Sequence, residues 1–160
     1  CWLNILAARR QSVAEIVRNH WEQYGRDVYT RHDYEGIATT AANELMQGLR
    51  ERTDEIQGQQ FGAYRVVKCD DFSYTDVVDN SVSSKQGIRI LFDNGARIVY
   101  RLSGTGTEGA TLRVYIEQPE RDPTRFDLDP QQSLADLVDL AAATAKIAEI
   151  TGRSAPDVIT

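Results

Sequence analysis

The 160-residue sequence predicts an α+β domain: an antiparallel sheet of four to five strands covered by helices on one face. Four segments between residues 64 and 117 alternate apolar and polar side chains, which is the periodicity of half-buried strands. Asn94-Gly95 joins two of these segments, and Asn-Gly between alternating segments is a strong hairpin signal. Apolar residues at helical spacing on both sides of this block predict helices that cover the sheet.

Residues 1–25 are expected to lie outside this domain, as the tail of a preceding domain followed by a hinge helix. Residues 2–6 are mostly apolar and have no helix cap before them. Ser12 and Glu15 have the spacing of a capping box, and Gly25 offers a stop, so a helix is expected between them. The chain opens on an apolar stretch without an initiator Met, and we expect residue 1 to be a cut rather than a natural start.

The domain proper is expected to span residues 26–160, with the element order β-α-β-β-β-β-α. An amphipathic helix is expected over residues 37–49, where apolar residues recur at helical spacing. Pro130 opens a long final helix that is expected to end near Gly152. The expected strands cover residues 28–32, 64–69 with 72–75 as an optional extension, 87–92, 96–102 and 111–117.

Composition is that of a globular domain and argues against several classes of partner. Hydrophobic residues make up 41%, enough for a core, and no apolar run approaches the length of a membrane span. The net charge of −6 argues against a general nucleic-acid binder, so an anion would have to be held by a local site. Cys1 and Cys69 form neither a CxxC pair nor a disulfide framework, which favours a reducing cytoplasm.

The run from residue 101 to residue 113 combines glycines, hydroxyl groups and two arginines in one turn between extended segments. Glycines let the backbone present N–H groups to an anion, Ser and Thr add donors, and arginines add charge and bidentate geometry. A glycine-rich hairpin without a ligand is the alternative, and arginines at both ends disfavour it. The sequence therefore predicts a phosphate-binding loop made of Arg101, Ser103, Gly104, Thr105, Gly106 and Arg113.

Two common nucleotide motifs do not account for this loop. Gly104, Gly106 and Gly109 formally match the dinucleotide fingerprint, which needs a strand before it and a helix after it. Residues 110–117 instead alternate as a strand does, and Pro119 follows. A Walker loop is excluded as well, because no Lys-Ser or Lys-Thr closes the glycine run.

Side chains along a strand alternate between its two faces, and this alternation predicts the positions of the two arginines. Arg101 shares a strand face with Arg97 and Val99, at the end of the strand that leads into the loop. Arg113 lies two residues into the returning strand, so the loop is expected to lie between two guanidinium groups. Solvated charges on a sheet face are the alternative interpretation for both. Their position on either side of a glycine-rich turn favours anion binding.

These residues carry a family resemblance. Residues 101–117 (RLSGTGTEGATLRVYIE) resemble the phosphate-binding loop of the last domain of phosphoglucomutases, in the phosphohexomutase superfamily. Further matches follow in order over residues 11–26, 29–35, 92–106 and 151–160. The resemblance implies the TBP-like fold of the last domain, and the final match resembles the ending of the glucose-specific branch. It also implies that Arg31, in YTRHDYE, lies near the active-site cleft.

The resemblance implies a role as well as a fold. Full-length phosphoglucomutases interconvert glucose 1-phosphate and glucose 6-phosphate through glucose 1,6-bisphosphate, using a phosphoserine and Mg²⁺. The Ser-His-Asn-Pro, DGDGDR and GEES motifs for these steps belong to three upstream domains and are absent here. The chain is therefore expected to be the carboxyl-terminal part, without catalytic residues or metal ligands and inactive alone. Its expected role is to bind the non-transferring phosphate and close the cleft.

The expected partners follow from this role: glucose phosphates and the three upstream domains, with no nucleic acid and no membrane. The alternative is a stand-alone phosphate-binding or interaction module that never joins a catalytic domain. The reading frame upstream of Cys1 separates the two, because phosphoserine and magnesium motifs there support the enzyme. A nucleic-acid binder, suggested by the TBP-like fold, is a weaker third because the net charge opposes it.

Overall fold

A seven-stranded sheet forms the body of the computed structural model, which describes residues 1–104 and 109–160. The strand order is β2-β3-β6-β7-β8-β1-β9, and every neighbouring pair is antiparallel. The expectation of four to five strands was therefore too low. The strands are β1 (Arg26–Ile37), β2 (Gln60–Phe61), β3 (Tyr64–Asp71), β6 (Ile88–Phe92), β7 (Arg97–Ser103), β8 (Ala110–Glu120) and β9 (Val158–Ile159).

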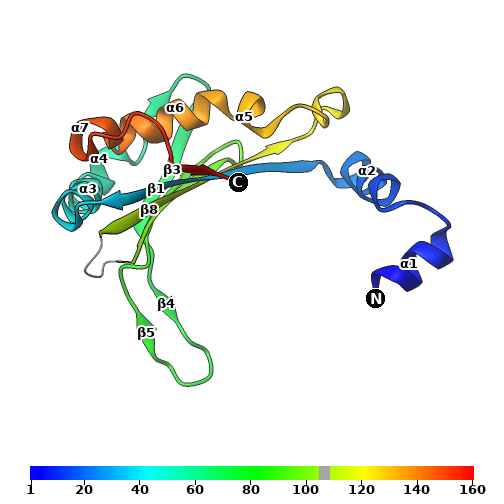
Figure 1. The fold of residues 1–160 in the computed structure, drawn as a ribbon, viewed down its shortest axis with the longest axis horizontal. Coiled ribbons are helices and arrows are strands. Elements are labelled where there is room, and N and C mark those ends of the chain that lie inside the picture. The colour runs from blue at the N-terminus through cyan, green and yellow to red at the C-terminus, as the bar shows by residue number, and fades with distance from the viewer. Residues whose placement is uncertain (105–108) are drawn as a thin grey trace.

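The helices that follow β1 and β8 lie on one side of the sheet, as expected for an α+β domain (Figure 1). α1 and α2 lie beyond one end of the sheet, so the opposite face is left uncovered over its middle strands (Figure 1). The helices are α1 (Trp2–Arg9), α2 (Val13–Tyr24), α3 (Thr39–Glu51), α4 (Thr53–Ile56), α5 (Pro130–Ser133), α6 (Ala135–Thr144) and α7 (Ile147–Thr151), with a 3₁₀ turn η1 at Pro123–Arg125.

The final helix, expected to be continuous, is divided into α5, α6 and α7. Lys146 interrupts it with a left-handed backbone at φ 50°, between α6 and α7. Pro130 begins α5 and Gly152 ends α7, as expected. Pro130 and Gly152 therefore predicted the two ends of this segment, whereas apolar periodicity did not reveal the breaks inside it.

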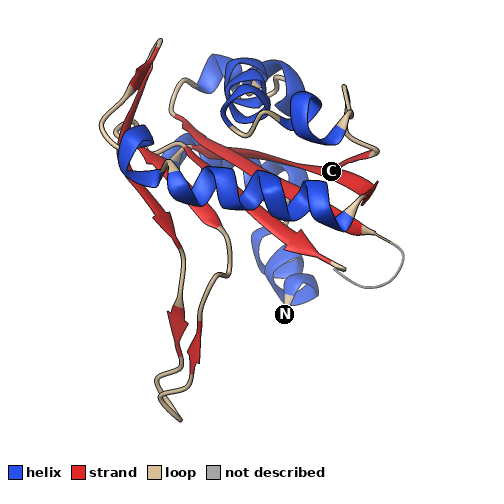
Figure 2. Ribbon diagram, turned by 90° about the vertical axis from the view of Figure 1, so that its left-hand side faces the viewer, coloured by secondary structure: helices blue, strands red, loops and turns tan. Residues whose placement is uncertain are grey.

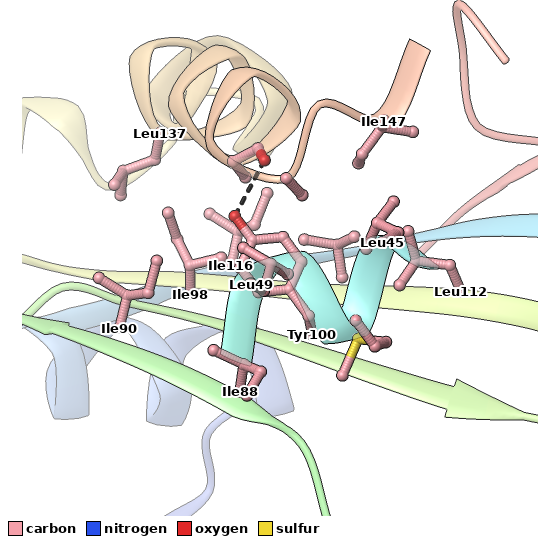
Figure 3. Close-up of a cluster of buried hydrophobic side chains, with 14 of the residues drawn as sticks. Leu45, Leu49, Ile88, Ile90, Ile98, Tyr100, Leu112, Ile116, Leu137 and Ile147 are labelled. Atoms are coloured by element: carbon pink, nitrogen blue, oxygen red, sulfur yellow. Dashed lines mark hydrogen bonds between the residues drawn. The ribbon is translucent and has the colours of Figure 1, made fainter. Parts of the chain in front are cut away.

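Alternate strand residues make the core between the sheet and the helices. Ile88, Ile90, Ile98 and Leu112 are almost completely buried on the helix-covered side (Figure 3). Tyr100 lies among them and donates a hydrogen bond from its hydroxyl to the carbonyl of Ala141 at 2.9 Å, which ties β7 to α6. Because strand side chains alternate, the intervening residues point to the uncovered face.

The hairpin predicted from Asn94-Gly95 is present between β6 and β7. Gly95 has φ 86°, a left-handed backbone that favours glycine, and the Phe92 amide donates to the Ala96 carbonyl at 2.9 Å. Ile90 pairs with Ile98 across the two strands. This register places β7 residues of odd number on the uncovered face, where the sequence placed Arg101.

The expected extension of β3 over residues 72–75 is wrong. Instead a separate two-stranded arm, β4 (Tyr74–Thr75) and β5 (Val82–Ser83), projects away from the sheet (Figure 2). Hydrogen bonds between Phe72 and both Gln86 and Gly87 continue the β3–β6 pairing into its base. The arm returns to the sheet at β6, beside the uncovered face.

The N-terminal helices are held to the sheet unequally. Ser12 and Glu15 form the predicted capping box at the start of α2. Trp21 of α2 packs edge-on against Phe126, with ring centroids 6.2 Å apart. No residue of α1 is buried.

The last residues of the chain form β9 at the edge of the sheet, an element that the sequence did not predict. β9 pairs with β1, where His32 lies opposite Ile159 and Asp33 opposite Val158. Arg31 and Thr160 exchange two backbone hydrogen bonds, at 2.8 and 3.0 Å. β9 therefore supports the middle of β1, where two charged side chains face the uncovered side.

Candidate anion-binding site

Arg101 and Arg113 lie directly opposite each other on β7 and β8. Because directly opposed residues of an antiparallel pair share a sheet face, both side chains are on the uncovered side. Asp33 of β1 is the next residue in the same row, opposite Arg113. The row therefore runs from a carboxylate through two guanidinium groups, at the end of the sheet where β7 leads into the loop.

Asp33 is the one buried carboxylate among the described residues, with 4% of its surface exposed. Its Oδ1 accepts a hydrogen bond from Nε of Arg31 at 2.9 Å. Its Oδ2 lies 3.7 Å from Nε of Arg113. A buried carboxylate is stable when it is paired with cations, and here Arg31 and Arg113 both lie beside the carboxylate of Asp33.

Arg113 is half-exposed and not fully satisfied within the described part of the chain. Its Nε is buried and has no hydrogen-bond partner there, since the distance to Asp33 exceeds hydrogen-bond length. The side chain is 40% exposed. Among the described residues its terminal amino groups form no ion pair within 4 Å and no hydrogen bond.

Arg101 differs from the other arginines on this face. Arg97 is paired with Glu117 through two contacts of 2.5 and 3.0 Å, and Arg89 is paired with Asp70 through contacts of 2.6 and 2.8 Å. Among the described residues no carboxylate forms an ion pair with Arg101. Two opposed guanidinium groups repel each other, and an anion between them would remove that repulsion.

The remaining predicted loop residues lie partly in the described chain. Ser103 is the last residue of β7, opposite Thr111, and Gly104 follows it with φ 65°. Thr105 and Gly106 lie outside the described residues. Ser103 and Gly104 thus sit two and three residues beyond Arg101, at the same end of the sheet as the arginine pair.

Arg31 lies on the same face, one row from Arg113, and pairs with Tyr115 across the strands. It shares a hollow of about 370 Å³ with Arg101, and both tyrosines of the hollow are on the uncovered face. The structure therefore places Arg31 and Arg101 at one hollow, whose lining does not include Ser103, Gly104 or Arg113. Further lining residues of the hollow are Tyr29, Val99, Tyr115 and the paired Arg97 and Glu117.

Two glycines lie where neighbouring strands approach closely, and neither was predicted as a site residue; Gly87 is the one that makes room for Arg101. Gly87, just before β6, lies so close to β7 that a Cβ there would be 2.6 Å from the Tyr100 carbonyl and 2.7 Å from Cγ of Arg101. Gly109, just before β8, would place a Cβ 3.1 Å from the Ile37 carbonyl. Both also have positive φ, at 154° and 102°. The sequence signal that could have identified them is their position at the start of a strand, where glycine often marks the close approach of another backbone.

Asp33 was also missed. Its signal was its spacing from Arg31, because residues two apart on a strand share a face. His32, which lies between them, points to the other side, is buried and has a 2.8 Å hydrogen bond to Gln131.

In the described part of the chain no group of three or more His, Cys, Asp or Glu side chains is arranged to hold a metal ion. None of the described helices has the length and apolar character of a membrane span.

Residues 26–157 match the family described as phosphoglucomutase-1, C-terminal domain. The chain belongs to the phosphoglucomutase family. It is 53% identical over 159 residues to a phosphoglucomutase of Rhizobium radiobacter and 47% identical over 165 residues to phosphoglucomutase-1 of Homo sapiens. In both comparisons 99% of this chain is covered.

The structural comparison agrees with this assignment. The crystal structure of parafusin, a phosphoglucomutase from Paramecium in its open form, superposes with a TM-score of 0.88 at 39% sequence identity, covering 99% of this chain. The chain spans 29% of the length of the two relatives named above and 28% of the parafusin chain. It therefore represents the C-terminal domain of a multidomain phosphoglucomutase.

Proposed function

We propose that this domain binds the phosphate of a glucose phosphate that is not being transferred, within a phosphoglucomutase that interconverts glucose 1-phosphate and glucose 6-phosphate. The observation that carries the proposal is the opposed pair Arg101 and Arg113 at the entrance to the glycine-rich loop. Such a pair offers several N–H donors in planar arrays, which suit phosphate oxygens. Family membership supports a sugar phosphate as the guest.

Charge supports a local site over a generally basic surface. The chain carries a net charge of −6, yet Arg101 and Arg113 lie together at the loop end of the sheet, and Asp33 is the one described carboxylate in ion-pair contact with either of them. Arg97 and Arg89, farther from the loop, are neutralised by Glu117 and Asp70. An anion is therefore drawn to one end of the face.

The proposed contribution to catalysis is orientation. Holding one phosphate fixes the position of the other end of the sugar, which lowers the entropic cost of reaching the transition state. Binding energy at a remote group can also drive closure of a mobile domain over the substrate, which excludes water from the reaction. Ser103 and the backbone of Gly104 would add donors to those of the arginine pair.

The other parts of the reaction belong to the rest of the polypeptide in this proposal. A phosphoserine, Mg²⁺ and the activator glucose 1,6-bisphosphate would be held by upstream domains, and the described residues do not fit a metal site. We also propose a cytoplasmic location, because Cys1 is exposed and Cys69 is buried, and both are free thiols.

Titration of the 160-residue chain with inorganic phosphate, followed by NMR, tests the proposal. The signals of Arg101, Ser103, Gly104 and Arg113 should shift together and saturate. Arg113→Ala should weaken the binding roughly tenfold to a hundredfold, because a charge-assisted hydrogen bond contributes about 1.5–3 kcal/mol.

Arg97→Ala is the matched control, on the same face and already paired with Glu117. It should leave the affinity for phosphate within about twofold of the unaltered chain. Equal losses from the two substitutions, or shifts spread evenly over all arginines of the face, would contradict a specific site.

A further inference from the structure

We infer that Asp33 is a positioning residue, which fixes the guanidinium groups of Arg113 and Arg31 on the uncovered face so that Arg113 is prepared for phosphate. The inference rests on the proposed phosphate site. It concerns a residue that touches no ligand in that proposal and acts through its two arginine partners.

The first support is geometric. Asp33 and Arg113 are directly opposed on β1 and β8, with Oδ2 and Nε 3.7 Å apart. The contact is made at the inner nitrogen of the guanidinium group, and the Arg113 side chain as a whole is 40% exposed. A carboxylate at this point restrains the rotation of Arg113 without occupying the donors that a phosphate needs.

The second support is that Asp33 is itself held firmly. Its carbonyl accepts a hydrogen bond from the Asp157 amide at 2.8 Å, and it pairs with Val158 of β9. Its Oδ1 accepts the 2.9 Å hydrogen bond from Arg31. Only 5% of its side chain is exposed, so water competes little for the carboxylate. The side chain therefore has a defined orientation from which to direct Arg113.

The third support is the cost of the arrangement. A carboxylate placed beside an anion site repels the anion, and burying it carries a desolvation penalty. Asp70 of β3 makes close contacts with both of its cations, Arg89 and Lys68, whereas Asp33 is divided between two arginines and leaves Nε of Arg113 without a hydrogen bond in the described chain. This division is understandable if the carboxylate serves to orient both arginines.

Asp33→Asn separates positioning from simple charge, because the two predict opposite signs. The substitution keeps the size of the side chain and removes one negative charge near the site. If Asp33 acted only as a local charge, binding of inorganic phosphate would become tighter. If Asp33 positions Arg113, the 160-residue chain should bind phosphate about tenfold more weakly despite the more favourable charge.

Asp70→Asn is the matched control. It removes the same charge from a part-buried carboxylate on the same face, which is also paired with an arginine. It should leave phosphate affinity unchanged within about twofold. Backbone NMR spectra of both variants show whether each is folded. Unchanged or tighter binding by Asp33→Asn would overturn the positioning role alone. A lack of phosphate binding by the unaltered chain would overturn the proposed site and the positioning role together.

A second measurement needs no substitution and covers the case in which Asp33→Asn does not fold. In the unaltered chain without phosphate, the Nε–H of Arg113 should exchange with water more slowly than that of Arg101, because Asp33 lies beside the former. Equal exchange at the two Nε–H groups would overturn the inference.

Discussion

Arg101 and Arg113 face each other across β7 and β8 on the uncovered side of the sheet, and Asp33 stands beside only the second of them. The two guanidinium groups are therefore not equivalent. Nε of Arg113 lies 3.7 Å from a buried carboxylate, whereas Arg101 has no carboxylate partner among the described residues. Phosphate binding is expected to order Arg101 more than Arg113.

Substitution of Gly87 should disturb the site through Arg101. Gly87→Ala would place a Cβ 2.6 Å from the Tyr100 carbonyl and 2.7 Å from Cγ of Arg101, at a backbone φ of 154°. We expect a loss of about 1–3 kcal/mol in the free energy of unfolding, together with weaker phosphate binding. Urea denaturation and the phosphate titration measure the two effects.

Gly48→Ala is the control for Gly87→Ala. Gly48 lies inside α3, and a Cβ there would meet nothing within 4 Å. The substitution should stabilise the chain by about 0.5–1 kcal/mol, because alanine loses less conformational entropy in a helix than glycine does. A stabilising effect of Gly87→Ala would show that the close approach between Gly87 and β7 is not present in solution.

The ion pair between Asp70 and Arg89 predicts a pH dependence of stability. Hydrogen bonds from Arg89 hold the pKa of Asp70 below its usual value of 3.8. Because the pKa is lower in the folded state, the pair contributes fully above pH 3.8 and its contribution is lost as the pH falls through the folded-state pKa. Asp70→Asn should therefore cost roughly 1 kcal/mol at pH 7 and progressively less below pH 3.8.

Urea denaturation of the unaltered chain and Asp70→Asn at several pH values measures this difference. High salt should reduce it, since both side chains are only partly buried. A difference that stayed constant down to pH 2 would mean that Asp70 stabilises the fold through packing and not through its charge.

Deletion of residues 1–10 should leave the fold intact. No residue of α1 is buried, and Trp2 and Leu3 are 52% and 81% exposed. We expect a change of less than about 1 kcal/mol in the free energy of unfolding, because little apolar area is uncovered by the deletion. Removing these exposed side chains should also reduce self-association, which sedimentation velocity detects. A large drop in thermal stability would show that α1 belongs to the core.

Sequence patterns predicted the long elements well because burial on one face imposes a strict repeat. Strands β3, β6, β7 and β8, helix α3 and the Asn94-Gly95 hairpin all follow from that repeat or from turn chemistry. β2 and β9 have two residues each, too few to show a period. The arm formed by β4 and β5 is exposed, so its side chains carry no burial pattern. The left-handed Lys146 has no local signal, because lysine does not favour that conformation.

The candidate site was predictable in part for a related reason. Arg101, Arg113 and the loop glycines are adjacent in sequence or share one hairpin, and their residue types indicate phosphate chemistry. Asp33 lies in β1, 68 residues before Arg101 in the sequence. Gly87 lies just before β6, 14 residues before Arg101. Their roles depend on the registers between β1 and β8 and between β6 and β7, which only the folded structure provides.

The most direct test of the account is the catalytic efficiency of the full-length phosphoglucomutase carrying Arg113→Ala, compared with the same enzyme carrying Arg97→Ala. Loss of the phosphate contact should lower kcat/KM for glucose 1-phosphate roughly tenfold to a hundredfold. Arg97→Ala should leave kcat/KM close to that of the unaltered enzyme. Phosphorylation of the proposed active-site serine by a small donor that does not need the phosphate site of this domain should survive Arg113→Ala. Equal losses of kcat/KM from the two substitutions would contradict a specific phosphate site at Arg101 and Arg113.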